Sequence, residues 1–167
     1  MAAMQNDEAK RTQRLLLERQ LCFRLYLASN LVTRLYRSHL DVMGLTYPQY
    51  LVMLLLWESE PQSVSQLGDR LHLDSGTLTP LLKRLEGAGL VVRRRDTVDE
   101  RRVLIALTQA GRALRARADA MLEAMEQETC FSPEDHVALG PQLDRYISDL
   151  SNQLSGRGRL SPAVTGE

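Results

Sequence analysis

The amino-acid sequence predicts a mainly α-helical fold with one small β-hairpin, on three observations. The chain has 167 residues, enough for one domain with appended helices. Hydrophobic residues make up 44% and charged residues 25%, which is the balance of a globular protein. Aromatic residues are scarce at 5% while Leu, Ala and Arg are abundant, and that mixture favours helices over sheets.

The first predicted helix covers residues 12–43. No Pro or Gly interrupts this stretch before Gly44, and glycine is a common helix stop. Apolar side chains recur at helical spacing, at Leu21, Leu25, Ala28, Val32 and Leu35. One face of this helix is therefore apolar along most of its length.

A second helix is predicted to begin near Thr46. Thr46 and Gln49 have the spacing of a capping box, and Pro48 lies in the first turn, where a missing N–H is harmless. The following residues 50–57 are apolar on nearly every side. We therefore expect this helix at the buried centre of the fold.

Two short helices should follow. Ser63 and Gln66 form another capping box, which starts a helix over residues 63–71. Residues 74–77 start the next helix, which turns its leucines inward. A turn at residues 72–74 joins the two into a helix-turn-helix. Pro80 either removes a hydrogen bond inside the second of these helices or shifts its start, and the sequence leaves both open.

The only predicted strands come directly after the helix-turn-helix. Residues 90–95 and 102–107 read as paired strands around a turn at residues 96–100, so the segment is a winged helix. Thr108 begins a second long amphipathic helix, to about residue 128. Residues 132–135 cap a last helix that runs to about Leu154.

Charge is balanced over the whole chain, with 21 basic and 21 acidic residues, so net charge indicates no partner. Locally, basic residues outnumber acidic ones between Lys83 and Arg102. Such a run alone is as often a solvated face as a binding site. Because this one coincides with a helix-turn-helix and a hairpin, we interpret it as a double-stranded DNA interface. The expected contact residues are Ser75, Thr77, Thr79, Lys83, Arg84, Arg93, Arg94, Arg95, Arg101 and Arg102.

Several other classes of protein lack support in the sequence. We find no span long enough to cross a membrane and no apolar signal segment, so a cytoplasmic location is expected. The two cysteines, Cys22 and Cys130, are then expected to be reduced at rest. Zinc-ligand spacing, a phosphate-binding glycine loop and a nucleophile elbow are all missing, so we expect neither a cofactor nor an enzyme.

One stripe on the first helix is unusual for its chemistry. Its members share one helical face at intervals of four and three residues: Cys22, Tyr26, Ser29, Thr33 and Tyr36. In one interpretation the thiol and the phenols are buried packing. In the other, the phenols donate hydrogen bonds to a reactive thiolate, with Tyr47 as a third donor. Spacing alone favours the packing interpretation and leaves the other open.

Residues 82–90 (LKRLEGAGL) and 99–108 (DERRVLIALT) resemble the MarR family of winged-helix regulators. The resemblance covers roughly residues 12–154. It implies an obligate homodimer held by the first, fifth and sixth helices. It also implies that Asp99 orients the wing and that Arg101 meets DNA. The expected organisation is an N-terminal dimerisation helix (1–45), the winged helix-turn-helix (46–108), C-terminal dimerisation helices (109–154) and a disordered tail (155–167).

Within that family, residues 21–23 (LCF), 45–53 (LTYPQYLVM) and 73–85 (LDSGTLTPLLKRL) resemble the OhrR subfamily of organic hydroperoxide resistance repressors. The resemblance implies that Cys22 senses peroxide and that Tyr26, Tyr36 and Tyr47 hydrogen-bond its sulfur. It assigns Cys130 as a resolving cysteine by position only. A bystander thiol remains the alternative for Cys130.

The sequence thus predicts a homodimeric repressor that releases a pseudo-palindromic operator when organic hydroperoxides oxidise Cys22. The expected product is an inter-subunit Cys22–Cys130 disulfide, with a mixed disulfide to a small thiol as the alternative. One rival is a MarR-type repressor gated by a small lipophilic or aromatic ligand, which needs no cysteine. The other is a thiol peroxidase, which needs a reductant partner and an acidic or basic helper beside Cys22.

Overall fold

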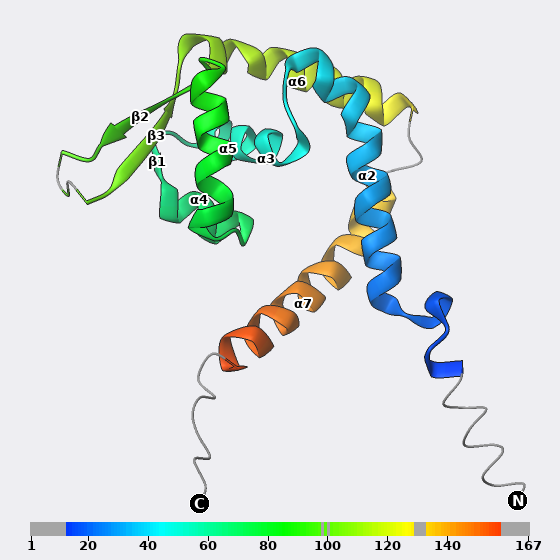
Figure 1. The fold of residues 1–167 in the computed structure, drawn as a ribbon. Helices are drawn as coiled ribbons and strands as arrows, with labels where there is room; N and C mark the ends of the chain where they lie inside the picture. Colours follow the sequence, from blue (N-terminus) through cyan, green and yellow to red (C-terminus); the bar gives the residue numbers. More distant parts are fainter. Residues whose placement is uncertain (1–12, 98, 100, 129–132, 158–167) are drawn as a thin grey trace, which may run out of the picture. The chain divides into compact units, whose positions relative to one another are not determined.

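The computed structural model describes residues 13–97, 99, 101–128 and 133–157. Within these residues lie six α-helices and a three-stranded antiparallel sheet, which confirms the predicted fold class. The chain divides into two compact units, Met1–Asp119 and Ala120–Glu167. The first unit contains the whole helix-turn-helix and its hairpin (Figure 1).

The first long helix is shorter than predicted. A 3-10 turn, η1 (Leu17–Arg19), precedes α2 (Leu21–Met43), so the prediction of one helix from residue 12 is wrong. Gln20 separates the two with an extended backbone, and its side-chain amide donates to the carbonyl of Arg14 at 2.5 Å. That bond gives the Arg14 carbonyl the donor that a backbone N–H would supply in a continuous helix. At the other end, Gly44 stops α2 as predicted, with a left-handed φ of 69°.

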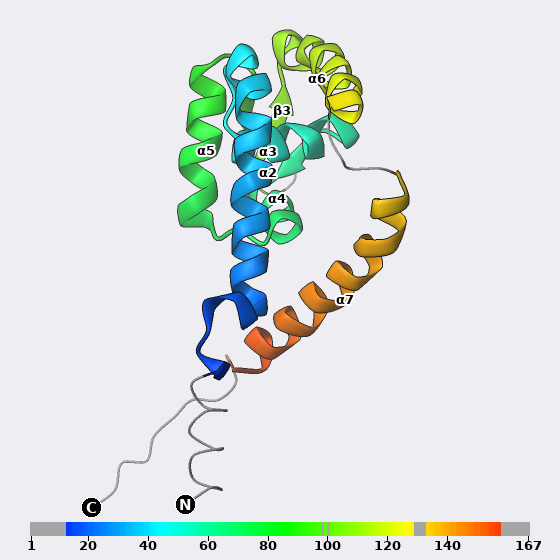
Figure 2. The ribbon, with the colours of Figure 1, turned by 90° about the vertical axis from the view of Figure 1, so that its right-hand side faces the viewer.

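Helix α3 (Tyr47–Glu58) is the buried centre of the first unit. The N–H of Thr46 donates to Gln49 Oε1 at 2.8 Å, which is the predicted cap. Val52 and Met53 are fully buried, and Leu56 is nearly so. Helix α3 contacts α2, α4 and α5, and Figure 2 shows it behind α2.

The helix-turn-helix consists of α4 (Val64–Leu71) and α5 (Ser75–Gly87). Leu78, Leu82 and Leu85 are fully buried on the inner side of α5, as predicted, whereas Leu81, which was also predicted to face inward, is only half-buried. Helix α5 continues through Pro80, which settles the question left by the sequence. The turn between the helices packs closely against α4 at Gly68. A Cβ on Gly68 would lie only 2.8 Å from the carbonyl oxygen of Leu73 in this turn.

The sheet has the order β1-β3-β2, with β1 (Gln62–Ser63), β2 (Val91–Arg95) and β3 (Val103–Leu107). Strands β2 and β3 form the predicted hairpin. Strand β1 was not predicted, since two residues carry no alternating pattern. Buried Gln62 holds it in place by donating its side-chain amide to the Leu55 and Ser59 carbonyls at 2.5 and 2.8 Å.

The last two helices are α6 (Gln109–Glu128) and α7 (Pro133–Arg157). Thr108 caps α6 as predicted, since its Oγ1 accepts the N–H of Gly111 at 3.0 Å. Helix α7 extends beyond the predicted end at Leu154, and the predicted cap at Ser132 lies outside the described residues. Among described helices none is long and apolar enough to cross a membrane alone; α2 and α3 pass that test only as a pair bent by 71°.

Candidate nucleic-acid interface and thiol site

The start of helix α5 is held by the side chain of Asp74. Thr77 donates its backbone N–H to Asp74 Oδ1 at 2.9 Å and its hydroxyl to Oδ2 at 3.0 Å. These hydrogen bonds, the backbone one first, hold the pKa of Asp74 below its usual range. Since the Thr77 hydroxyl proton is engaged, its oxygen offers a ligand only acceptor lone pairs.

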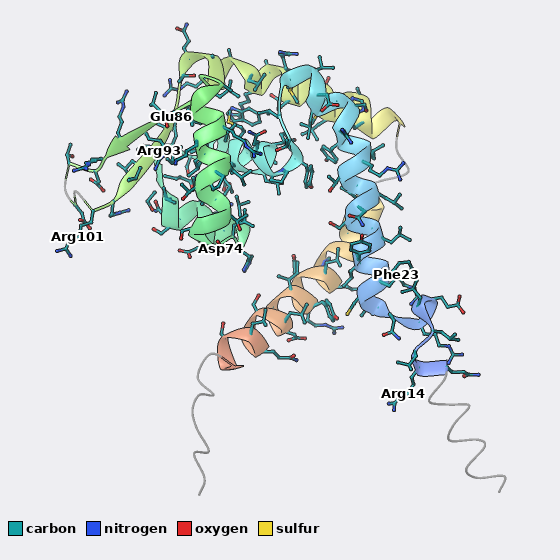
Figure 3. All side chains as sticks on the ribbon, in the orientation of Figure 1. Arg14, Phe23, Asp74, Glu86, Arg93 and Arg101 are labelled. Atoms are coloured by element: carbon teal, nitrogen blue, oxygen red, sulfur yellow. The ribbon has the colours of Figure 1, made fainter. Side chains whose placement is uncertain are left out.

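The outward face of α5 carries the other predicted contact residues. Ser75, Lys83 and Arg84 are exposed, and Thr79 is half-buried. Asp74 caps the start of the helix and Glu86 lies in its last turn, as the labelled side chains in Figure 3 show. Small hydroxyl groups therefore lie near the N-terminus of α5, and the long basic side chains lie toward its C-terminus.

The tip of the hairpin is folded by Asp99. Its carboxylate Oδ1 accepts the N–H of Arg101 at 3.1 Å, and its carbonyl accepts the N–H of Arg102 at 2.9 Å. Arg102 closes the turn through an ion pair with Asp96, with 3.6 Å between Nη1 and Oδ2. The guanidinium of Arg101 is left exposed at the far end of the hairpin (Figure 3). Asp99 and Arg102 thus shape the tip, which presents the Arg101 side chain to solvent.

The three arginines of strand β2 do not share one face of the sheet. Arg93 is opposite Ile105, which is fully buried, so the Arg93 side chain stands on the core side. It is half-buried, and its Nε has no hydrogen-bond partner in the part of the chain that the structure describes. Arg94 and Arg95 are exposed, on alternate faces. A ligand approaching the hairpin therefore meets these two before Arg93.

Three tyrosines gather where α2 meets α3. The ring centroids of Tyr36 and Tyr47 are 5.1 Å apart, and Tyr50 lies 5.8 Å from the first and 6.4 Å from the second. Burial raises the pKa of Tyr36 and of Tyr47, and it raises that of nearly enclosed Tyr50 to about 12. All three phenols are therefore protonated at neutral pH and able to donate a hydrogen bond.

Cys22 lies far from this cluster within one chain. The rise of α2 from Cys22 to Tyr36 amounts to about 21 Å, although both residues share one helical face. Cys22 is exposed, and so is Tyr26 one turn further on. The interpretation of Cys22 as a buried packing residue therefore fails for the single chain. Cys130, the predicted resolving residue, lies outside the described residues.

Sequence reasoning missed a set of contacts that join α3 and the loop after it to the hairpin and to α6. The indole Nε1 of Trp57 donates to the Gly111 carbonyl at 2.9 Å. Glu60 accepts one hydrogen bond from the backbone of Leu107 and one from the Arg112 side chain, both at 2.6 Å. No local signal marks these residues, because each contact joins positions about 50 residues apart. Within the described residues, no cluster of His, Cys, Asp and Glu is arranged to hold a metal ion.

A helix-turn-helix followed by an arginine-bearing hairpin defines the class of winged-helix regulators. The model of the MarR family matches residues 45–103. With the relatives described next, this match shows that the chain belongs to the MarR family.

Two curated relatives share about half of their aligned residues with this chain. The organic hydroperoxide resistance transcriptional regulator of Bacillus subtilis (strain 168) is 54% identical over 102 residues, which are 61% of this chain and 69% of the relative. The regulator TtmR of Methylorubrum extorquens (strain PA1) is 51% identical over 134 residues, 80% of this chain and 69% of the relative. Both are transcriptional regulators by name.

Solved structures of AbfR are similar in fold. AbfR of Staphylococcus epidermidis has a TM-score of 0.70 and 38% identity, over 85% of this chain and 98% of that one. Reduced AbfR bound to DNA has a TM-score of 0.69 and 37% identity, over 84% and 98%. The disulfide form of AbfR has a TM-score of 0.57 at 36% identity, over 88% and 99%.

Proposed function

We propose that this protein is a redox-sensing transcriptional repressor that binds operator DNA and releases it when organic hydroperoxides oxidise Cys22. The observation that carries the proposal is the hairpin tip, where Asp99 folds the turn and leaves the Arg101 guanidinium exposed beside a helix-turn-helix. Relatives named as a hydroperoxide regulator and as a DNA-bound reduced regulator support the two halves of the proposal.

DNA recognition follows from the geometry of α5 and the hairpin. The N-terminal half of α5 presents Ser75 and Thr79 to base edges in the major groove, while Lys83 and Arg84 reach phosphates. Arg101 enters the neighbouring minor groove from the hairpin tip. Two copies related by a two-fold axis would read two half-sites, so the operator is expected to be pseudo-palindromic.

Arg101→Ala should raise the dissociation constant for DNA about 5- to 150-fold, because a guanidinium in a groove contributes roughly 1–3 kcal/mol. The DNA is a duplex that the wild-type protein selects from a random-sequence library. The substitution should also flatten the dependence of affinity on salt, since one fewer counterion is released. Fluorescence anisotropy at several salt concentrations measures both quantities. Arg37→Ala is the control, because Arg37 is also an exposed arginine but lies on α2, outside the predicted contact residues. Equal effects of the two substitutions would remove Arg101 from the interface.

The thiol step begins with the Cys22 thiolate. It attacks the terminal oxygen of the hydroperoxide and breaks the O–O bond, which leaves a sulfenic acid on Cys22 and releases an alcohol. The thiolate of Cys130 from a partner subunit then attacks the sulfenic sulfur, forms a disulfide and displaces water after proton transfer.

The phenols act in this scheme on Cys22 of the partner subunit. Tyr36 and Tyr47 are adjacent to one another but about 21 Å along α2 from their own Cys22. Protonated phenols stabilise a thiolate by donating hydrogen bonds to it and so lower the thiol pKa. The dimer would thereby complete a site that a single chain holds in two separate parts. Tyr26, one turn from Cys22, would contribute from the same helix.

Oxidised wild-type protein should run as a covalent dimer on a non-reducing denaturing gel and return to monomer with dithiothreitol. A Cys130→Ser protein treated with cumene hydroperoxide should stay monomeric and accumulate sulfenic or over-oxidised Cys22, because nothing resolves the first product. Dimedone labelling followed by mass spectrometry distinguishes these species. A monomeric band with an internal Cys22–Cys130 disulfide would rule out the inter-subunit step while leaving DNA binding intact.

A further inference from the structure

Glu60 joins three elements of the first unit through one carboxylate. It lies in the loop between α3 and β1, and its side chain is only 22% exposed. Oε2 accepts the backbone N–H of Leu107, the last residue of β3, at 2.6 Å. Oε1 accepts Nε–H of Arg112, in the first turn of α6, at 2.6 Å. Charged acceptors make shorter and stronger hydrogen bonds than neutral ones.

The bond to Leu107 extends a strand pairing that is otherwise very short. In the β1–β3 ladder, Gln62 is opposite Ile105 and Ser63 is opposite Leu104. Glu60 precedes β1 by two residues and lies outside this ladder, as Leu107 lies two residues beyond Ile105 on β3. The Glu60 side chain therefore supplies an acceptor where the backbone ladder has ended.

The position of this bond matters because β3 leads back from the hairpin tip. The five residues of β3 rise about 17 Å, so a tilt of about 10° at Leu107 moves the far end by about 3 Å. A contact in a DNA groove tolerates much less displacement, since functional groups must be held to within about 0.5 Å. The base of β3 is therefore the point from which the direction of Arg101 is set.

The other partner of Glu60 is itself anchored. Helix α6 is held on α3 by the hydrogen bond from Trp57 Nε1 to the Gly111 carbonyl at 2.9 Å. Gly111 immediately precedes Arg112, so the Glu60–Arg112 ion pair ties the end of β3 to the part of α6 that α3 also contacts. Without Glu60, the Leu107 N–H would lose its side-chain acceptor, and the Arg112 guanidinium would lose this carboxylate.

We propose that Glu60 is a positioning residue for DNA recognition, which sets the angle of the hairpin so that Arg101 meets its groove. The proposal rests on the proposed operator binding and goes beyond it by assigning a residue that touches no DNA. If Glu60 acts through the direction of the hairpin, its contribution to affinity disappears once the Arg101 side chain is removed. If Glu60 only stabilises the fold, its contribution is the same with and without Arg101.

A double-mutant cycle on the reduced full-length protein separates these two roles. The probe is a DNA duplex selected by the wild-type protein from a random-sequence library, and the readout is the dissociation constant by anisotropy. Glu60→Ala is expected to raise this constant about tenfold beside Arg101 and less than about twofold in the Arg101→Ala background. The same factor in both backgrounds would overturn the proposal.

Glu58→Ala is the matched control, because Glu58 is a nearby carboxylate that pairs with Arg70 at 2.7 Å, on the helix-turn-helix side. It should leave the cycle additive. If Glu60→Ala fails to fold, Glu60→Gln and Arg112→Gln carry the same cycle, since each keeps a side chain of similar size. Additive effects with intact DNA binding defeat this inference alone, whereas a wild-type protein that selects no duplex defeats the proposed function as well.

Discussion

A Cys22→Ser protein should bind DNA as tightly as the wild type and should keep it bound after treatment with organic hydroperoxide. A serine hydroxyl is not ionised at neutral pH and forms no sulfenic acid, so the first step of the response is lost completely. The substitution should cost little stability, because Cys22 is exposed on the first half of α2.

A gel-shift titration before and after cumene hydroperoxide measures this effect. We expect the wild type to lose at least about tenfold in affinity, the lower end of a strong allosteric coupling, and the variant to lose nothing. Ser29→Ala is a control on the same helical face, because the Ser29 side chain is exposed and its substitution removes no thiol. Release of DNA by oxidised Cys22→Ser would refute the sensor assignment, and a response to a non-oxidising ligand would favour a ligand-gated repressor.

Gly111→Ala should be the most destabilising small substitution in the first turn of α6. A Cβ on Gly111 would lie 2.1 Å from the Leu90 carbonyl oxygen and 3.2 Å from a Leu107 methyl group. Backbone atoms cannot move aside as a side chain can, so α6 must shift and strain its bond to Trp57. We expect a loss of about 2–4 kcal/mol in the free energy of unfolding. The melting temperature should fall by about 4–16 °C.

Chemical unfolding followed by tryptophan emission measures this loss, because Trp57 is the only tryptophan. Gly87→Ala is the matched control: nothing lies within 4 Å of its added Cβ. That variant should be neutral or slightly more stable, since alanine restricts the unfolded chain. Equal stability of the two variants would show that the contact between Gly111 and Leu90 is not a tight one.

The elements that sequence reasoning predicted well are those whose signals are local. The capping pairs Thr46–Gln49 and Ser63–Gln66 both form, with main-chain to side-chain distances of 2.8 Å. Gly44 adopts the left-handed backbone expected where a helix ends. These features depend on residues two to four positions apart, so they can be predicted without knowledge of the fold.

The break in the first helix at Gln20 could not be predicted in the same way. The periodicity of residues 12–43 is helical throughout, yet the backbone is extended at Gln20. Periodicity reports which face is apolar and not whether a neighbouring element packs on that face. In the structure, Leu15 is 84% exposed and Leu17 is 61% exposed, so burial does not hold the N-terminal residues in a helix.

The candidate site shows the same division. Helical spacing placed Cys22 and Tyr36 on one face of α2, and the hairpin pattern placed Arg101 between the predicted turn and the returning strand. The sequence by itself therefore determined the winged-helix class and most of the residues proposed to meet DNA or peroxide, because caps, turns and alternation are short-range properties. Only the tertiary structure decided that Tyr36, Tyr47 and Tyr50 cluster away from Cys22, and that Glu60 joins β3 to α6. Those contacts connect residues from 11 to about 50 positions apart, and how closely such residues approach depends on how the helices pack, which no local pattern records.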